Sequence, residues 1–309
     1  MIEAEQLSKR YGTTLAVDGL SFSVEAGQVT GFLGPNGSGK STTMRMIVGL
    51  DAPTSGTVTV GGRAYGAVRF PLHEVGALLD ATAAHPGRRA RNHLRWLADS
   101  NRIPRSRVDE VLAIVGLTEA AHRRVGELSL GMGQRLGIAA ALLGDPAVLI
   151  LDEPINGLDP EGILWVRHLL RSLAAEGRTV LVSSHLMTEM ALTADQLIII
   201  GRGRLLSTGP TADFIEKSAG HHVRVVTPDA DALVVLLRDK GAVVTADGPQ
   251  ELSVQGLESR DVGILASGAG LTLYELSTQR ASLEDAFMEL TREHAEYQGT
   301  THTPEAGHP

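Results

Sequence analysis

The sequence contains no cysteine, few aromatic residues and no long apolar segment. Without cysteine, neither a disulfide framework nor a thiolate metal site can form, and a reducing cytosol is the expected compartment. The longest apolar stretches, such as 147–151 and 197–200, are far shorter than the roughly 20 residues that span a bilayer. The polar N-terminus MIEAEQLSKRYG does not resemble a signal peptide. Any membrane role is therefore expected to depend on a partner.

The charge balance is acidic. Lys and Arg number 28 against 36 Asp and Glu, which gives a net charge of −8. This balance argues against a dominant nucleic-acid surface, and no direct nucleic-acid partner is expected. The chain has 309 residues, of which 43% are hydrophobic. Because single cores seldom grow past roughly 250–300 residues, this length predicts one large α/β domain and a smaller one.

A glycine-rich segment directly follows the apolar run 29–33. Glycines at its turns allow backbone N–H groups to point inward around a polyphosphate. Lys40 is placed to reach the β- and γ-phosphates, Ser41 can ligate Mg²⁺, and the helix that follows adds its positive end. The alternative is a simple strand-to-helix turn. The predicted nucleotide-binding residues are Gly34, Pro35, Asn36, Gly37, Ser38, Gly39, Lys40, Ser41 and Thr42.

A second predicted strand, 147–151, ends in the adjacent carboxylates Asp152 and Glu153. Burying carboxylates at such a strand end is costly unless a cation or a reaction requires them. Side chains of neighbouring strand residues point apart, so the two can have different tasks. Asp152 suits a water-mediated contact to Mg²⁺, and Glu153 suits a general base for the attacking water. A solvated strand end is the alternative.

The rest of the first 217 residues alternates between strands and helices. Apolar periodicity predicts a helical insert over 88–143 and a helix over 163–173, which together with the strands indicates a parallel sheet. Strands are predicted at 2–7, 20–24, 29–33, 57–60, 147–151, 179–182 and 197–200. Gly12, Gly19 and Gly27 are predicted to separate the first three, and Gly61-Gly62 to close a hairpin.

A break near 217–220 precedes a different pattern. The order strand, helix, strand, strand, helix, strand is typical of a ferredoxin-like α+β domain. Ser282, with Asp285 three residues later, predicts the start of a last helix through a capping-box-like pair. Residues 295–309 are expected to form a flexible tail. The predicted elements of this domain are 223–226, 229–240, 242–245, 251–254, 259–266 and 272–276.

The segment 128–135, LSLGMGQR, lies between the phosphate loop and the carboxylates. Ser129 and Gly131 before a helix predicted at 136–143 form either a second anion site or an ordinary helix cap. With the other motifs, the segment resembles the LSGGQ signature of the ATP-binding cassette family, the ATPase subunits of ABC transporters. Leu130 and Met132 depart from that signature, whereas Gln134-Arg135 match the residues that follow it.

Further motifs of this family occur in order. Tyr11 resembles the aromatic residue that stacks on adenine, although it could equally be a half-buried edge residue. Asp159, in Gly157-Leu158-Asp159, resembles the D-loop at the dimer interface; otherwise it would be a helix cap. His185 resembles the switch histidine that senses the γ-phosphate. Asp80 stands where the family's Q-loop has glutamine; it can approach Mg²⁺ but cannot donate an amide hydrogen bond.

The resemblance implies a P-loop NTPase fold with a mixed sheet core, an antiparallel β subdomain and a helical subdomain at about 80–145. It implies an ATP-binding domain over 1–217 and an accessory domain over 220–294. It also implies an ATPase that uses ATP and Mg²⁺, with Lys40, Glu153 and His185 as catalytic residues and Ser41, Asp152 and Asp80 at the metal.

Two copies are expected to meet head to tail, with each ATP held between one phosphate loop and Ser129 and Gly131 of the other copy. The acidic Q-loop position is similar to a subgroup that exports drugs, peptides or lipid-like molecules. The implied location is the cytoplasmic face of the membrane, bound to a separate transmembrane permease.

Three other functions remain open at this point. The chain could gate or sense a membrane protein without transport. A DNA-repair or chromosome ATPase would need a long coiled coil between the halves of the site, and the stretch from Lys40 to Asp152 contains no sustained heptads. A translation regulator of this family resembles two cassettes in tandem, whereas this chain has one. The transported molecule cannot be read from this chain.

Overall fold

The computed structural model describes residues 1–217, 222–279 and 282–291. They form two compact units, one built on Met1–Pro210 and the other on Thr211–Glu289. The expected domain break near 217–220 falls mainly outside the described residues, as does the expected tail at 295–309. No helix within the described ranges has the length and apolar character that crossing a bilayer requires.

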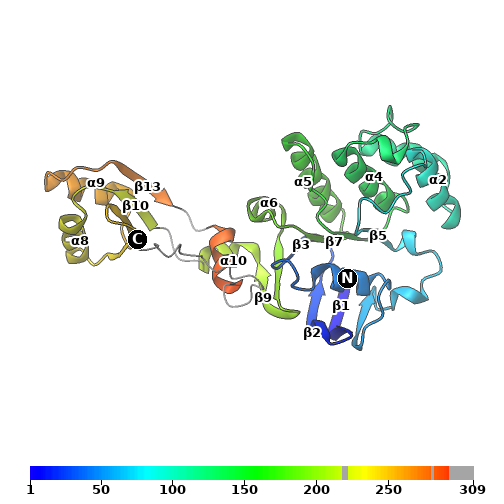
Figure 1. Cartoon of the computed structure of the whole chain (residues 1–309), viewed down its shortest axis with the longest axis horizontal. Coiled ribbons are helices and arrows are strands. Elements are labelled where there is room, and N and C mark those ends of the chain that lie inside the picture. Colours follow the sequence, from blue (N-terminus) through cyan, green and yellow to red (C-terminus); the bar gives the residue numbers. More distant parts are fainter. Residues whose placement is uncertain (218–221, 280–281, 292–309) are drawn as a thin grey trace, which may run out of the picture. The chain divides into compact units, whose positions relative to one another are not determined.

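The first unit contains two sheets (Figure 1). A three-stranded antiparallel sheet has the order β2-β1-β4, and a six-stranded sheet has the order β5-β6-β7-β3-β8-β9. The bounds are β1 (Ile2–Tyr11), β2 (Thr14–Val24), β3 (Gln28–Leu33), β4 (Ser55–Val60), β5 (Val75–Leu78), β6 (Val148–Leu151), β7 (Thr179–Ser183), β8 (Gln196–Gly201) and β9 (Arg204–Pro210).

The large sheet is parallel except at one edge. β3 pairs in parallel with β7 and β8, whereas β9, which the sequence analysis did not predict, pairs with β8 in antiparallel. The expected mixed sheet is thereby confirmed. Every residue from Val29 to Leu33 is buried, as expected for a central strand covered on both faces. The loops after β3, β6 and β7 all leave the same edge of this sheet, since parallel strands share one direction.

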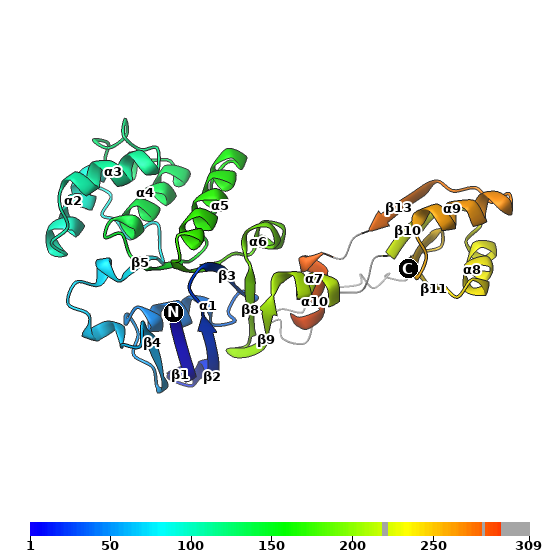
Figure 2. The same ribbon diagram turned by 180° about the vertical axis from the view of Figure 1, so that it is seen from behind.

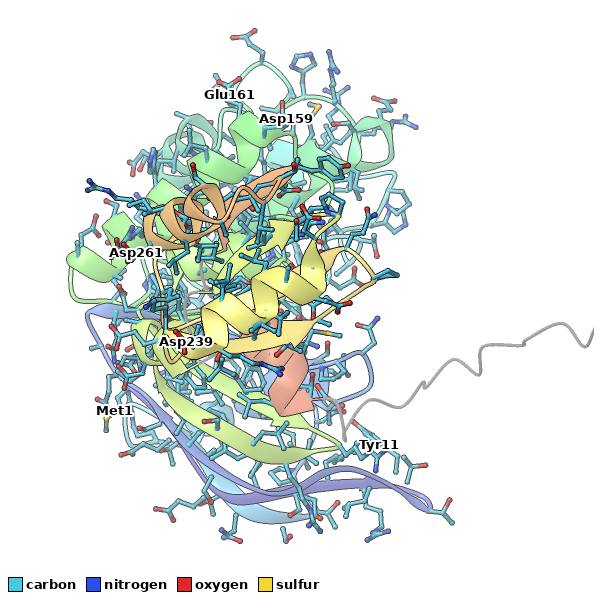
Figure 3. The ribbon with its side chains drawn as sticks, turned by 90° about the vertical axis from the view of Figure 1, so that its left-hand side faces the viewer. Met1, Tyr11, Asp159, Glu161, Asp239 and Asp261 are labelled. Carbon is cyan, nitrogen blue, oxygen red and sulfur yellow. The ribbon has the colours of Figure 1, made fainter. Side chains whose placement is uncertain are left out.

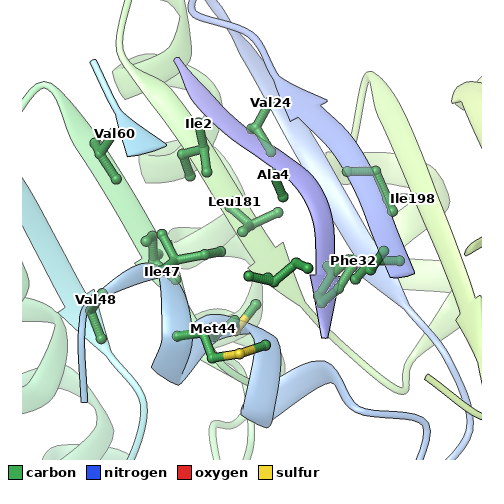
Figure 4. Packing of buried hydrophobic residues seen from close by; sticks show 14 of the residues in the cluster. Ile2, Ala4, Val24, Phe32, Met44, Ile47, Val48, Val60, Leu181 and Ile198 are labelled. Atoms are coloured by element: carbon green, nitrogen blue, oxygen red, sulfur yellow. The ribbon is translucent and has the colours of Figure 1, made fainter. Parts of the chain in front are cut away.

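Helix α1 (Lys40–Ile47) lies between the two sheets. Its buried Met44 and Ile47 pack in one cluster with Ile2 of the small sheet and Phe32 of the large sheet (Figure 4). Phe32 and Ile2 are fully buried, and burying such a side chain contributes about 1.5–3 kcal/mol. This cluster fixes the N-terminus of α1, and with it the loop that precedes the helix.

The remaining helices of the first unit are α2 (Ala90–Ser100), α3 (Ser106–Ile114), α4 (Leu130–Leu142), α5 (Pro160–Ala175) and α6 (Met187–Thr193). Figures 1 and 2 show α2 to α5 on one side of the six-stranded sheet and the three-stranded sheet on the other. The predicted helix at 136–143 in fact begins at Leu130, because Ser129 caps it by accepting a hydrogen bond from the Met132 N–H at 3.2 Å.

The first two strands also differ from their prediction. β1 and β2 run longer than 2–7 and 20–24, and Gly19 lies inside β2 instead of ending a strand. The β1–β2 register shifts on both sides of Leu7, and the backbone N–H of Gly19 donates to Ser8 Oγ at 2.9 Å. A local irregularity in the pairing, not a strand break, is therefore what this glycine marks.

The second unit has a four-stranded antiparallel sheet with the order β11-β12-β10-β13, the arrangement of the expected ferredoxin-like domain. Alternate strand residues, such as Val223 and Val254, pack against Leu233 and Val262 of the covering helices. The last predicted strand, 272–276, lies three residues later. The bounds are α7 (Thr211–Lys217), β10 (His222–Val226), α8 (Ala230–Asp239), β11 (Val243–Ala246), β12 (Glu251–Gln255), α9 (Ser259–Gly268), β13 (Glu275–Gln279) and α10 (Leu283–Thr291).

The start of α10 agrees with its prediction. Ser282 Oγ accepts a hydrogen bond from the Asp285 N–H at 3.1 Å, and the Ser282 N–H donates to Asp285 Oδ2 at 3.3 Å. These are the two reciprocal bonds of a capping box.

Candidate nucleotide-binding site

An open pocket of about 460 Å³ lies at the carboxyl edge of the large sheet. The loops after β3, β5 and β6 line it, together with the first turn of α1, one residue of β2 and one residue of α4. The residues of this ATP-site pocket are Ala16, Asn36, Gly37, Ser38, Gly39, Lys40, Ser41, Thr42, Leu79, Asp80, Ala81, Thr82, Gln134, Asp152, Glu153 and Asn156. The structure thus brings the predicted phosphate loop, both carboxylates and Asp80 to one place.

The phosphate loop depends on two glycines. Gly39 has a φ of 101°, and a Cβ there would lie 2.6 Å from the carbonyl oxygen of Ala16. A Cβ on Gly34 would lie 2.3 Å from Ser38 Oγ and 2.5 Å from the carbonyl oxygen of Ile200. All three contacts are too close for a Cβ atom. The loop conformation therefore requires glycine at both positions.

Lys40 is folded back onto this loop. Its Nζ donates to the carbonyl oxygen of Gly34 at 2.6 Å and to that of Pro35 at 3.1 Å. Burial lowers the pKa of the Lys40 ammonium, while the charges of Glu153 and Asp152 act in the opposite direction. A partly desolvated ammonium at the start of a helix is a strong attractor for a polyphosphate.

Ser41 and Asp152 meet although they lie far apart in sequence. Ser41 Oγ donates to Asp152 Oδ2 at 2.7 Å, and Ser183 Oγ donates to Asp152 Oδ1. Hydroxyl and carboxylate oxygens are the hard ligands that Mg²⁺ prefers, and Mg²⁺ usually keeps several waters and phosphate oxygens. Among the described residues no group of three or more His, Cys, Asp or Glu side chains could form a metal cage. The hydroxyl oxygen of Ser41 and the carboxylate of Asp152 suit a Mg²⁺ ion that also binds the nucleotide phosphates.

Asp80 lines the same pocket, but its carboxylate accepts hydrogen bonds from its own loop. Asp80 Oδ1 accepts hydrogen bonds from the N–H and the hydroxyl of Thr82, both at 2.7 Å. These two bonds hold the pKa of the Asp80 carboxyl below its usual value. Asp80 therefore lines the pocket while Oδ1 is engaged by Thr82 of its own loop.

Glu153 is held by contacts to both its backbone and its side chain. Its φ is 51°, an uncommon value for a non-glycine residue. Its N–H donates to Ser183 Oγ at 2.9 Å, and its carbonyl oxygen accepts from Gln134 Nε2 at 2.8 Å. His185 Nδ1 lies 2.9 Å from Glu153 Oε2. Backbone strain of this kind is often stored where a side chain must be aimed at a reaction centre.

The residues predicted for the second wall of the site do not line this pocket. Ser129 caps α4, and Asp159 caps α5 by accepting from the Gly162 N–H at 2.9 Å. A Cβ on Gly131 would lie 3.0 Å from the carbonyl oxygen of Gly157, so the 128–133 segment packs against the 157–159 loop. None of Ser129, Gly131 and Asp159 is among the residues that line the pocket of the phosphate loop.

Tyr11 also lies outside the pocket lining. Its side chain is 46% exposed, its hydroxyl donates to Asp51 Oδ2 at 2.8 Å, and Lys9 Nζ is 5.0 Å from the ring centroid. Figure 3 labels Tyr11 at the small sheet and Asp159 at the start of α5, at opposite ends of the unit. The ring is anchored and accessible, which suits a stacking surface.

Two contributors to the site were missed by sequence reasoning. Gln134 entered the prediction only through the family resemblance, and Ser183 was not predicted as a site residue, yet both are at least 95% buried and bond to the carboxylate pair. A polar residue at the end of the strand adjacent to β6 was the available signal for Ser183. Gln134 could be found only once the fold placed α4 beside Glu153.

This arrangement defines a class, the P-loop ATPases, in which a glycine-rich loop at the end of a central strand faces an Asp-Glu pair on a neighbouring strand. Comparison with known proteins narrows the class. A family profile described as ABC transporter matches residues 17–156, and one described as a domain of unknown function matches 221–284.

Relatives that match over most of their length support the same family. An uncharacterized ABC transporter ATP-binding protein of Bacillus subtilis is 36% identical over 297 residues, covering 95% of this chain and 96% of the relative. The bacitracin transport ATP-binding protein of Bacillus licheniformis is 36% identical, covering 94% and 97%. A Nod factor export ATP-binding protein of Burkholderia orbicola is 40% identical over 240 residues, covering 75% and 78%.

A solved ATP-binding subunit of an ABC transporter superposes with a TM-score of 0.64 at 25% identity, over 69% of this chain and 91% of the other. The chain belongs to the ABC transporter ATP-binding proteins, and it is an ATP-binding and ATP-hydrolysing subunit. The expected fold, family and activity are thereby confirmed.

Proposed function

We propose that this chain works as a head-to-tail dimer in which each ATP lies between the phosphate loop of one copy and Ser129 and Gly131 of the other. The observation that carries this proposal is the separation within one chain. The N-terminus of α4, a site suited to anions, packs with the 157–159 loop and does not line the chain's own pocket. One chain therefore offers one wall of the site, and a second copy supplies the other.

Within each site the residues have distinct tasks. The Lys40 ammonium binds the β- and γ-phosphates, and Ser41 and Asp152 hold Mg²⁺, with Asp80 approaching it through the oxygen that Thr82 does not engage. Bound Mg²⁺ would neutralise phosphate charge that develops during transfer. Glu153 orients or deprotonates the attacking water, and His185 contacts the γ-phosphate. Tyr11 stacks on the adenine, which leaves base selectivity loose.

A second pocket of about 540 Å³, the coupling groove, supports a membrane partner. Residues of α2 and α4, the residues 77–81 and 83–84, and residues at and after the end of α1 line it. Two of its apolar lining residues are exposed, Trp96 by 57% and Leu50 by 61%. Leu79, Asp80 and Ala81 line both this groove and the ATP-site pocket. We propose that a permease segment inserts apolar side chains here, so that the segment 79–81 connects its movement to the nucleotide.

The proposed work is export through a separate transmembrane permease at the cytoplasmic face of the membrane. Relatives named for bacitracin transport and for Nod factor export support a drug, peptide or lipid-like substrate. ATP joins the two copies because its γ-phosphate is a shared ligand, and hydrolysis releases them. This cycle of closing and opening drives the permease.

Two measurements test this function. If only the dimer is active, the ATPase rate per chain must rise with protein concentration; a rate per chain that is constant under dilution into the monomer range would contradict it. For the coupling groove, Trp96→Glu should prevent co-purification with the permease while leaving ATP binding intact. Val235→Glu is the matched control, since Val235 is 70% exposed on α8 of the second unit.

A further inference from the structure

The backbone of Glu153 is clamped by side chains from two different elements. Ser183, at the end of β7, accepts from the Glu153 N–H, and Gln134, in the second turn of α4, donates to the Glu153 carbonyl at 2.8 Å. Ser183 is fully buried, and Gln134 is 4% exposed. Because the φ of Glu153 is 51°, the residue persists in this conformation only while its surroundings determine it.

Gln134 lies on the helix whose first residues are proposed to contact the other ATP. α4 is one continuous helix from Leu130 to Leu142, with Ser129 as its cap. Gln134 follows Ser129 by five positions, so the two are separated by only about 7.5 Å along the axis. A displacement of Ser129 along the axis is therefore transmitted to Gln134 almost without loss.

We propose that Gln134 is a positioning residue that couples the two ATP sites of the dimer. This inference rests on the proposed head-to-tail dimer. When the ATP held by the partner's phosphate loop engages Ser129, α4 is fixed, and Gln134 holds the Glu153 carbonyl so that the carboxylate faces the chain's own ATP. When that contact is absent, Gln134 withdraws with α4, and Glu153 loses one side of its clamp.

The bond from the Gln134 amide differs from those of the neighbouring residues, because it connects Glu153 to α4. Arg135, the next residue, instead donates to the Val115 carbonyl at 3.1 Å and lies 4.7 Å from the Trp165 ring, so it joins α4 to neighbouring helices. Asn156 also donates its N–H to the Glu153 carbonyl, at 3.2 Å, from the loop that follows. Among these bonds, only that from Gln134 connects Glu153 to the helix that begins at Ser129.

The test removes the amide of Gln134 and keeps a side chain of similar length. Gln134→Met removes the donor and keeps a buried, unbranched side chain; Gln134→Glu places an acceptor against the carbonyl. Gln255→Met, on β12, is the control for the same loss of an amide elsewhere. We expect both Gln134 variants to lower turnover about 10- to 100-fold, the scale expected for a catalytic group misplaced by about 1 Å, while the dissociation constant for ATP is unchanged.

The readout specific to coupling is cooperativity. The Hill coefficient of the ATPase reaction should fall toward one in Gln134→Met, whereas ATP-driven dimerisation in the Glu153→Gln background should be retained. Turnover and Hill coefficient equal to wild type would overturn the proposal. So would lowered turnover with an unchanged Hill coefficient, which would restrict Gln134 to its own site, or lost dimerisation, which would make its role structural.

Failure of the dimer proposal itself would look different. A Glu153→Gln protein that shows no ATP-driven dimerisation contradicts the proposed function, whatever the Gln134 variants do. Wild-type dimers that hydrolyse ATP with a Hill coefficient of one would overturn the coupling through Gln134 and leave the dimer in place.

Discussion

The imidazole of His185 lies against the carboxylate of Glu153, with Nδ1 2.9 Å from Oε2, and the backbone N–H of His185 donates to the same oxygen at 3.3 Å. The two residues follow β7 and β6, neighbouring parallel strands whose ends meet at one sheet edge. Glu153 is 24% exposed and His185 58% exposed at the side chain. The histidine therefore orients the carboxylate from the solvent side while Ser183 and Gln134 hold its backbone from within.

Replacing His185 should lower the turnover of ATP while leaving the binding of ATP intact, because His185 orients the Glu153 carboxylate. His185→Ala removes the ring contact to Glu153 Oε2, so we expect turnover to fall about 100-fold, within the range for a group assisting acid–base catalysis. Binding of ATP, measured by equilibrium titration, should change little. His168→Ala, at an exposed position of α5, is the control and should behave as wild type. Equal losses in both variants would contradict the role of His185.

The burial of the Lys40 ammonium leads us to expect that the affinity for ATP depends on pH. Burial lowers the pKa of its ammonium, so the charge that binds the phosphates is lost at a lower pH than for an ordinary lysine. Affinity for ATP, measured from neutral pH upward, should therefore weaken before about pH 10.4, the unperturbed value. Lys40→Arg, whose guanidinium stays charged, should weaken binding but remove this alkaline loss.

The same shift predicts the sign of a stability change. Between the lowered pKa of folded Lys40 and the ordinary value of the unfolded chain, the unfolded state binds more protons. The contribution of Lys40 to the free energy of unfolding therefore rises with pH across that window. Chemical denaturation of wild type and Lys40→Met at several alkaline pH values measures it, and an opposite slope in the difference would contradict the burial of the ammonium.

If Asp80 contacts Mg²⁺, removing its charge should change the Mg²⁺ requirement of the ATPase without changing the stability of the fold. Asp80→Asn keeps the acceptor that Thr82 uses but removes the charge, so the Mg²⁺ concentration for half-maximal ATPase should rise about tenfold, the lower end for residues that support a metal site. Asp99→Asn, which removes an exposed charge paired with Arg105, should leave it unchanged. A normal Mg²⁺ requirement in Asp80→Asn would exclude Asp80 from the metal site.

A side chain at position 34 should disturb the phosphate loop, because Gly34 lies too close to its neighbours. The methyl group of Gly34→Ala would overlap Ser38 Oγ and the Ile200 carbonyl, so the loop must shift; overpacking of this kind costs about 1–3 kcal/mol. We expect a lower melting temperature and loss of ATP binding. Gly66→Ala, where a Cβ meets no atom within 4 Å, should be neutral in both measurements.

Sequence reasoning succeeded where chemistry demands particular residues at fixed spacing. The phosphate loop, the Asp152-Glu153 pair and the βαββαβ order of the second unit were predicted because glycine freedom, paired carboxylates and apolar periodicity are local properties. Boundaries failed where tertiary contacts decide them. Helix α4 begins six residues earlier than predicted because Ser129 caps it, and Gly19 marks an irregular register inside β2.

Other features depend on the packed fold and left no local signal. The contact of Gln134 with Glu153 joins positions from different elements, so no spacing rule points to it. The caps formed by Ser129 and Asp159 were among the alternatives considered for these residues; both form here. Their proposed contacts across a dimer need a second chain, which neither the sequence nor one folded chain contains.

The most direct test of the central claim uses Glu153→Gln. This change removes the carboxylate that acts on water but keeps the contacts of the Glu153 backbone, so ATP should bind without being hydrolysed and should hold two chains together. The measurement is the molar mass of this variant in solution without nucleotide, with ADP, and with Mg-free ATP. We expect a monomer in the first two conditions and a dimer with ATP; a monomer in all three would contradict the head-to-tail dimer.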